Sequence, residues 1–266
     1  MTTATGLPWR RFFLLLAVAG LLVLGGCTTT GGDKYASAGG SAADVRHRAQ
    51  THLELAAGYL EHGQLQVAQS EAQIALQSDP SYADAYDLSG MVYMAMNDHE
   101  QARAQFQRAM TLKKDNASAM HNLAWLLCQD RNYAESDALF ARALDAPNAN
   151  RPQTLLARGV CQARAGNPAQ AEATLMRAYE LDAANPLTGY NLALLMFQRG
   201  DAERARFYIR RLNNSELANA ESLWLGIRVE RQLGDRVAVE QLAEQLRRRF
   251  PDSVELSAYE QGRFDE

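Results

Sequence analysis

Hydrophobic residues recur along most of this chain at the three- and four-residue spacing of amphipathic helices, and the whole pattern repeats at a nearly constant interval. A small residue returns in steps of 34, 34, 35 and 34 residues, at Ala56, Gly90, Ala124, Gly159 and Ala193. Further small residues keep the same phase, at Ala68, Ala102, Ser136, Ala171 and Ala205. Because a generic helical bundle has no fixed period, this pattern predicts helical hairpins stacked from residue 49 onward.

Other residues fall into the same period and indicate how each hairpin is built. Aromatic residues recur as Tyr59 and Tyr93 in the first helix of a unit, and as Phe106 and Phe140 in the second. Gly63, Gly166 and Gly200 mark the turn between the two helices, where a glycine ends a helix at positive φ, and Pro80 closes the first unit. Small residues are expected where the two backbones approach closely.

These positions resemble the consensus of the tetratricopeptide repeat (TPR). The resemblance implies an all-α, right-handed superhelical solenoid of about six helix-turn-helix units. A repeat domain is expected over residues 45–266, with a looser sixth unit that caps the array before a C-terminal tail. The expected units lie near residues 49–82, 83–116, 117–151, 152–185, 186–218 and 219–252.

The N-terminus has the pattern of an export signal. Arg10 and Arg11 precede an apolar run over residues 12–24, which is typical of a secretory signal peptide. As a helix this run would reach only about 20 Å, which is too short for the bilayer core of about 30 Å. Residues 1–26 are therefore predicted to be removed.

The signal peptide ends in Leu24, Gly25, Gly26 and Cys27, which resemble the bacterial lipobox. This implies a lipid anchor with acyl chains such as palmitate on Cys27, although an ordinary signal peptide with a chance cysteine is the alternative. Thr28 is not the aspartate associated with inner-membrane retention, so the resemblance implies the outer membrane, facing the periplasm. Residues 27–44 are rich in Gly, Ser, Thr and Ala and are expected to form a flexible tether.

Charge and composition argue against several classes of function. The formal net charge of the 266 residues is -4 and is spread without long single-sign runs, so no nucleic-acid-binding face is expected. The three cysteines form no CxxC pair, and no histidine stands at metal-ligand spacing, so no metal site is expected. No catalytic or cofactor-binding motif occurs, and we expect a protein without catalytic residues or cofactors.

Two cysteines remain besides the one expected to carry lipid. Cys128 and Cys161 fall in the first helices of neighbouring units, and such helices pack about 8 to 10 Å apart. Two inward-facing cysteines there can approach the Cα separation that a disulfide requires, and the periplasm is oxidising. The sequence therefore predicts a bridge between the third and fourth units, with two buried free thiols as the alternative.

The TPR resemblance also implies where a partner would bind, because the first helices of such repeats line a concave face. The residues at the inward positions are mostly apolar, which suits an amphipathic helix or an extended segment of another protein. Trp125 is the leading candidate contact. Packing against neighbouring repeats is the alternative for these side chains. The expected groove residues are Met91, Met94, His121, Trp125, Tyr190, Leu194 and Phe197.

Stretches outside the generic repeat pattern point to one family. These stretches are residues 122–128 (NLAWLLC), 167–171 (NPAQA) and 222–228 (SLWLGIR), the last of which leads to Arg249, Phe250 and Pro251. They are similar to the type IV pilus biogenesis lipoproteins of the PilF/PilW family, and the stretch 222–228 carries most of the similarity. The resemblance implies a pilotin-like factor that binds subunits of the pilus secretin, the outer-membrane channel, and promotes secretin localisation and multimerisation. Other pilus alignment proteins or pilin are further implied partners. A TPR adaptor for cell-envelope maintenance and a component of outer-membrane protein assembly are the alternatives.

Overall fold

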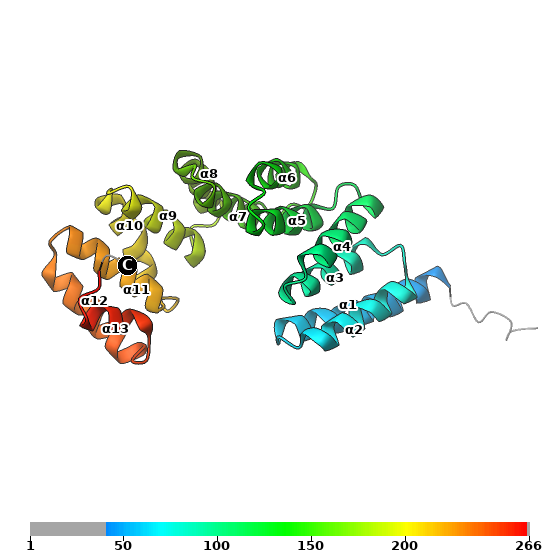
Figure 1. The fold of residues 1–266 in the computed structure, drawn as a ribbon, viewed down its shortest axis with the longest axis horizontal. Helices are drawn as coiled ribbons and strands as arrows, with labels where there is room; N and C mark the ends of the chain where they lie inside the picture. Colours follow the sequence, from blue (N-terminus) through cyan, green and yellow to red (C-terminus); the bar gives the residue numbers. More distant parts are fainter. Residues whose placement is uncertain (1–40, 265–266) are drawn as a thin grey trace, which may run out of the picture. The chain divides into compact units, whose positions relative to one another are not determined.

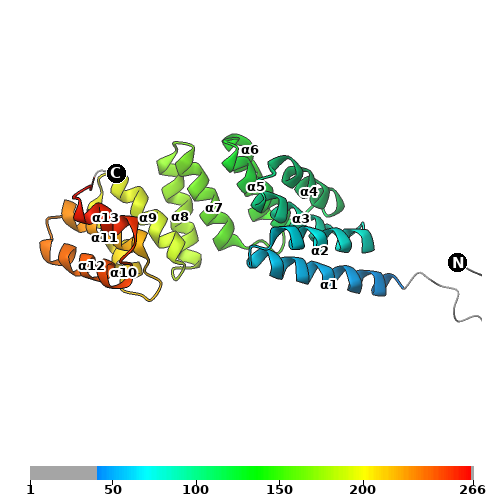
Figure 2. The ribbon, with the colours of Figure 1, turned by 60° about the horizontal axis from the view of Figure 1, so that its bottom comes forward.

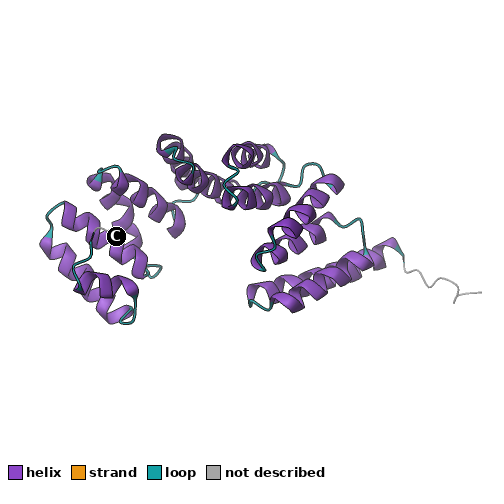
Figure 3. Cartoon of the chain, viewed as in Figure 1, coloured by secondary structure: helices purple, strands orange, loops and turns teal. Residues whose placement is uncertain are grey.

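The structure, a computed structural model, describes residues 41–264, and these form α-helices joined by short turns (Figure 3). The expected signal peptide, Cys27 and most of the expected tether lie outside the described residues. The helices are α1 (Ala42–Glu61), α2 (Leu65–Ser78), α3 (Ala83–Ala95), α4 (His99–Leu112), α5 (Ala117–Gln129), α6 (Tyr133–Asp145), α7 (Arg151–Arg164), α8 (Pro168–Leu181), α9 (Pro186–Gln198), α10 (Ala202–Asn213), α11 (Ala220–Gln232), α12 (Arg236–Arg249) and α13 (Val254–Glu260).

Consecutive helices pair into six hairpins, and α13 packs on the last of them. Two views of residues 41–264 show the hairpins following one another in chain order (Figure 1, Figure 2). Each odd-numbered helix up to α9 also contacts the next odd-numbered helix, whereas no two even-numbered helices approach each other as closely within residues 41–264. The odd-numbered helices therefore line the inner side of the array, which confirms the predicted all-α solenoid.

The first helix begins earlier than the sequence pattern suggested. Ser41 accepts a hydrogen bond from the backbone N–H of Asp44, and the Asp44 carboxylate accepts one from the backbone N–H of Ser41, which forms a capping box. As a result α1 starts at Ala42, inside the stretch expected to be tether, and runs for 20 residues. The glycine and serine content of the stretch obscured this cap.

The turns inside the hairpins place one residue at positive φ. Glycine takes this position in four hairpins, with φ between 70° and 81°, whereas Asn97 and Arg131 take it in the second and third, at 61° and 63°. Positive φ costs little for glycine and more for a residue with a Cβ atom. The turns of the second and third hairpins were hard to recognise from the sequence because neither contains glycine.

Small residues lie where the two helices of a hairpin cross. Ala56, Ala124 and Ala193 are all fully buried. A Cβ atom added to Gly159 would lie 2.6 Å from Cγ of Leu175, which is closer than atoms can pack. The recurring small residue is therefore required by the close approach of the two backbones.

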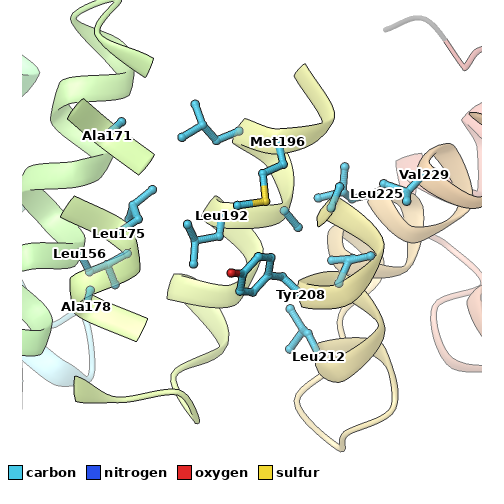
Figure 4. Close-up of a cluster of buried hydrophobic side chains, with 14 of the residues drawn as sticks. Leu156, Ala171, Leu175, Ala178, Leu192, Met196, Tyr208, Leu212, Leu225 and Val229 are labelled. Carbon is cyan, nitrogen blue, oxygen red and sulfur yellow. The ribbon is translucent and has the colours of Figure 1, made fainter. Parts of the chain in front are cut away.

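Larger apolar side chains fill the space around these crossings. One cluster of buried residues runs from α7 to α11 and includes Leu175, Leu192, Met196 and Leu225 (Figure 4). A second cluster runs from α4 to α7 and contains both Phe106 and Phe140. A third covers the end of the array between α11 and α13. The core is thus a series of local clusters, which is typical of repeat proteins.

Candidate functional site

A shallow groove lies on the inner side of the array, across α5, α7 and α9. Its volume is about 450 Å³, and its apolar lining comprises Trp125 from α5, Leu156 and Val160 from α7, and Leu187 from α9. Leu187 is 58% exposed, so this wall of the groove presents apolar surface to water. Because three successive inner helices contribute, the groove exists only where the hairpins are stacked.

Trp125 occupies the α5 wall of this groove. The indole is half-buried and packs against the cluster that contains Phe140, so its position is well defined. The guanidinium carbon of Arg164 lies 5.1 Å from the centroid of the Trp125 ring, within the range of a cation–π interaction. The groove wall therefore presents an aromatic face with a positive charge beside it.

Besides Arg164, the polar residues of the groove lining are His121, Gln153 and Asn191. Nδ1 of His121 lies 3.0 Å from the Thr154 hydroxyl, and its ring meets Phe140 edge-on at 5.7 Å. Burial lowers the pKa of His121, so the imidazole is neutral at neutral pH. The Asn191 side chain donates to the backbone carbonyl of Leu187 over 2.7 Å. Arg164 is thus the one cation of the groove lining, which includes no carboxylate.

The structure divides the seven predicted groove residues into two sets. His121 and Trp125 line the groove. Met91 and Met94 pack beside the cluster that contains Phe140, and Tyr190, Leu194 and Phe197 pack beside the cluster of Figure 4. These five side chains are half-buried, as Trp125 is, and the prediction that they contact a partner stays a prediction.

Seven of the nine residues that line the groove were not singled out from the sequence, and three of the seven are large apolar residues. Leu156 and Val160 stand in α7 at the same repeat positions as His121 and Trp125 in α5, three residues before and one residue after the recurring small residue. Leu187 stands six residues before Ala193 in α9. Reading every unit at the same offsets would have found Leu156 and Val160, whereas the exposure of Leu187 depends on the tertiary arrangement.

A disulfide joins the two helices that form most of the groove. The structure bonds Cys128 of α5 to Cys161 of α7, with Cα atoms 5.9 Å apart. The Ser136 hydroxyl lies 3.4 Å from the Cys161 sulfur and donates to the carbonyl of Ala124. The bridge thus links the third and fourth hairpins through α5 and α7, both of which line the groove.

The part of the chain that the structure describes contains neither a metal-binding cluster nor a membrane-spanning helix. Among residues 41–264, no three His, Cys, Asp or Glu side chains are grouped so that they could hold a metal ion. None of the helices in the same range combines the length and the apolar character needed to cross a bilayer.

Stacked helical hairpins with an apolar groove on their inner helices define a helical-repeat protein of the kind that binds polypeptides. Residues 83–116 and 116–146 match family models described as Tetratricopeptide repeat. The chain is 26% identical to the type IV pilus assembly protein PilF of Pseudomonas aeruginosa over 252 residues, which covers 94% of this chain and 98% of PilF.

Two solved structures are similar over most of both chains. PilW, described as a widely conserved type IV pilus biogenesis factor, superposes with a TM-score of 0.72 at 28% identity, covering 79% of this chain and 97% of PilW. The structure of P. aeruginosa PilF superposes with a TM-score of 0.70 at 24% identity, covering 82% of this chain and 99% of PilF. The chain is therefore a PilF/PilW-like tetratricopeptide-repeat protein.

Proposed function

We propose that this protein acts in type IV pilus biogenesis as an outer-membrane lipoprotein that holds subunits of the pilus secretin and promotes their localisation and multimerisation. The observation that carries the proposal is the similarity to PilF, which extends over 94% of this chain and 98% of PilF and so is not confined to the repeats that many proteins share. The similarity to PilW, at 28% identity, supports the same pathway.

Cys27 is the residue that would place the protein at the membrane. Its lipobox and the preceding signal peptide lie outside the described residues, so the anchor rests on the sequence pattern. More than one acyl chain gives stable membrane attachment, whereas a single chain binds only marginally. Anchoring the repeat domain beside the membrane would raise the effective concentration of a bound secretin subunit there.

The groove across α5, α7 and α9 is the surface that would hold the subunit. Covering Trp125 and Leu187 with a partner segment removes apolar surface from water, which contributes about 25 cal/mol per Å². A tryptophan flanked by an arginine is the type of pair that often dominates a protein interface. The mechanism is therefore capture on the inner face combined with delivery by the lipid.

The test separates capture from delivery. Trp125→Ala should weaken co-purification of the secretin by roughly thirtyfold, since an interface hot spot contributes about 2 kcal/mol or more. Phe207→Ala is the matched control, because Phe207 is an aromatic residue of the outer helix α10 that is 64% exposed and does not line the groove. Cys27→Ser should keep secretin binding but lose secretin multimers at the outer membrane.

Deleting the gene distinguishes the proposal from its alternatives. Loss of secretin multimers and of twitching motility is the expected result. A general loss of outer-membrane barrel proteins would instead indicate a role in outer-membrane protein assembly, and a cell-wall defect with intact pili would indicate an envelope adaptor. Intact secretin multimers in the deletion strain would rule out the secretin role.

A further inference from the structure

One position of the inner helices differs in chemistry between the last hairpin and those before it. The residue two places after the recurring small residue is apolar and almost fully buried in the second to fifth hairpins, whereas the sixth hairpin has an arginine there. The four apolar residues are Val92, Leu126, Cys161 and Leu195, and the arginine is Arg228. A cation has thus taken a position that normally packs two neighbouring inner helices together.

Arg228 lies against an aromatic ring and forms no ion pair with any of residues 41–264. Its guanidinium carbon is 5.0 Å from the centroid of the Phe197 ring, on the adjacent inner helix α9. Its Nε atom is buried and has no hydrogen-bond partner among residues 41–264. A buried donor without an acceptor costs about 1 to 3 kcal/mol. Arg228 as a whole is only half-buried, so the other end of its guanidinium remains accessible to a bound acceptor.

Other arginines of the same region do have carboxylate partners. Arg206 and Arg210 both bond to the buried carboxylate of Glu230, at distances of 2.7 and 2.6 Å. Arg228 forms no such ion pair within the described residues, although Glu221 and Glu255 lie close enough to act on its neighbour Tyr190. Burial, followed by these two carboxylates, raises the pKa of Tyr190, and Arg228 opposes them.

The arrangement repeats that of the groove. In both places an arginine of one inner helix lies over an aromatic ring of the preceding inner helix, as Arg164 of α7 does over Trp125 of α5. Neither arginine is in an ion pair within residues 41–264, in a chain whose net charge is -4. Two unpaired cations on the inner helices of an acidic protein complement a partner that is apolar and acidic.

We propose that Arg228 binds a carboxylate of the polypeptide segment held on the inner face, so that the preferred occupant is an apolar segment carrying acidic side chains. A guanidinium donates two parallel hydrogen bonds to a carboxylate. The two Nη atoms of Arg228 are the donors that a partner can reach, since its Nε is buried. Arg164 supplies a second positive charge beside Trp125. The inference rests on the proposed function only in taking the inner face as the place where a polypeptide is held.

The experiment uses the full-length chain in detergent and two fluorescein-labelled peptides of eight residues. One peptide alternates leucine with aspartate, and the other alternates leucine with asparagine. Fluorescence anisotropy should show roughly tenfold tighter binding of the aspartate peptide at low salt, which corresponds to one charge-assisted hydrogen bond. Because both peptides share the same detergent background, the ratio of their affinities reports the recognition of charge.

Arg228→Met removes the charge but keeps a long side chain against Phe197. We expect it to lose the preference for aspartate while its melting temperature stays equal to that of the wild type or rises, because the unpaired donor is gone. Arg228→Gln is a second variant without charge and should lose the same preference. Arg177→Met is the control, since Arg177 is an exposed arginine of the outer helix α8, and it should keep the preference.

The possible outcomes decide between a binding role and a structural role. A wild-type protein without preference for aspartate, or an Arg228→Met protein that keeps it, would overturn the inference. A lower melting temperature in both Arg228 variants would also overturn it, because the arginine would then be structural. If the preference is found but the secretin does not bind, the inference stands and the proposed partner is wrong. If the secretin binds but the preference for the aspartate peptide is absent, the proposed partner stands and the inference about Arg228 is wrong.

Discussion

The first hairpin and the two central hairpins share one architecture but are packed with different side chains. The buried side chains of α1 and α2 are all alanine, whereas α5 and α6 bury Leu126, Leu127 and Phe140. The contrast is sharpest at one repeat position, four residues after the small residue of the second helix. There the first hairpin has Ala72, and the second and third have Phe106 and Phe140.

The repeat pattern therefore fixes how the two helices of a hairpin cross, whereas the size of the buried side chains, and with it the stability, differs between hairpins. Alanine allows the backbones of α1 and α2 to approach closely but buries little apolar surface, so the first hairpin depends on its contacts with α3. The central hairpins bury large side chains and are joined by the Cys128–Cys161 bridge. The region that carries the groove is therefore the one built most firmly.

The largest expected effect comes from emptying the central core. Phe140→Ala should lower the free energy of unfolding by about 3 to 5 kcal/mol, because Phe140 is fully buried and the cavity cannot collapse easily. Leu55→Ala in α1 is the matched change in the first hairpin, and since Leu55 is 45% exposed it should cost less than about 1 kcal/mol. Urea denaturation followed by circular dichroism measures both. Equal losses would contradict the comparison.

Reducing the disulfide should have the next largest effect. The bridge closes a loop of sequence separation 33, for which the chain-entropy estimate is about 3 to 4 kcal/mol of stabilisation. A thiol count on a Cys27→Ser protein should give no free thiol before reduction and two after it. The double variant Cys128→Ser/Cys161→Ser, measured beside it, should show the same loss of stability as the reduced protein. Two free thiols in the untreated protein would show that the bridge does not form.

Replacing either of two glycines inside helices should change the free energy of unfolding by a smaller amount, and the two changes should have opposite signs. Gly159→Ala in α7 should lower the free energy of unfolding by about 1 to 3 kcal/mol, because the new methyl group would meet the side chain of Leu175. Gly58→Ala in α1 should raise it by about 0.5 to 1 kcal/mol, since no heavy atom lies within 4 Å of the added Cβ and alanine favours a helix. Thermal melts of both proteins test the pair. A destabilising Gly58→Ala would show that the first hairpin is packed as tightly as the fourth.

The smallest expected effect on stability comes from Asp79, which lies in the turn between α2 and α3. Asp79 accepts hydrogen bonds from Ser81 and pairs with Arg46 of α1 at 2.8 Å, and these contacts, led by the Ser81 side chain, lower its pKa from 3.8. A carboxylate with a lowered pKa stabilises the fold above its ordinary pKa, and this contribution is lost as the pH falls through the lowered value. Asp79→Asn should therefore cost roughly 1 kcal/mol at neutral pH.

Melting temperatures measured from pH 7 down to strongly acidic pH test this expectation. The difference between wild type and Asp79→Asn should shrink as the pH falls below the ordinary value of 3.8 and Asp79 becomes protonated. Asp115→Asn is the control, because Asp115 is exposed, and it should change little at any pH. A difference that stays constant with pH would show that the charge of Asp79 does not matter.

Much of the fold was predictable because each hairpin repeats the same local rules. The recurring small residues marked the helix crossings, and the period put Cys128 and Cys161 in neighbouring first helices. The start of α1 was missed because its cap, Ser41 with Asp44, lies in a stretch of tether-like composition. The groove was found only in part, since Met91 and Phe197 occupy equally inward positions but are packed between helices.

The sequence by itself determined the class of protein, because a 34-residue period of small and apolar residues is compatible only with stacked helical hairpins. The tertiary structure decided which inner positions stay accessible. An inner position can contact either a neighbouring helix or a ligand, and the choice depends on how three successive helices are stacked. For the same reason the unpaired state of Arg228 was invisible in the sequence, where it is one arginine among many.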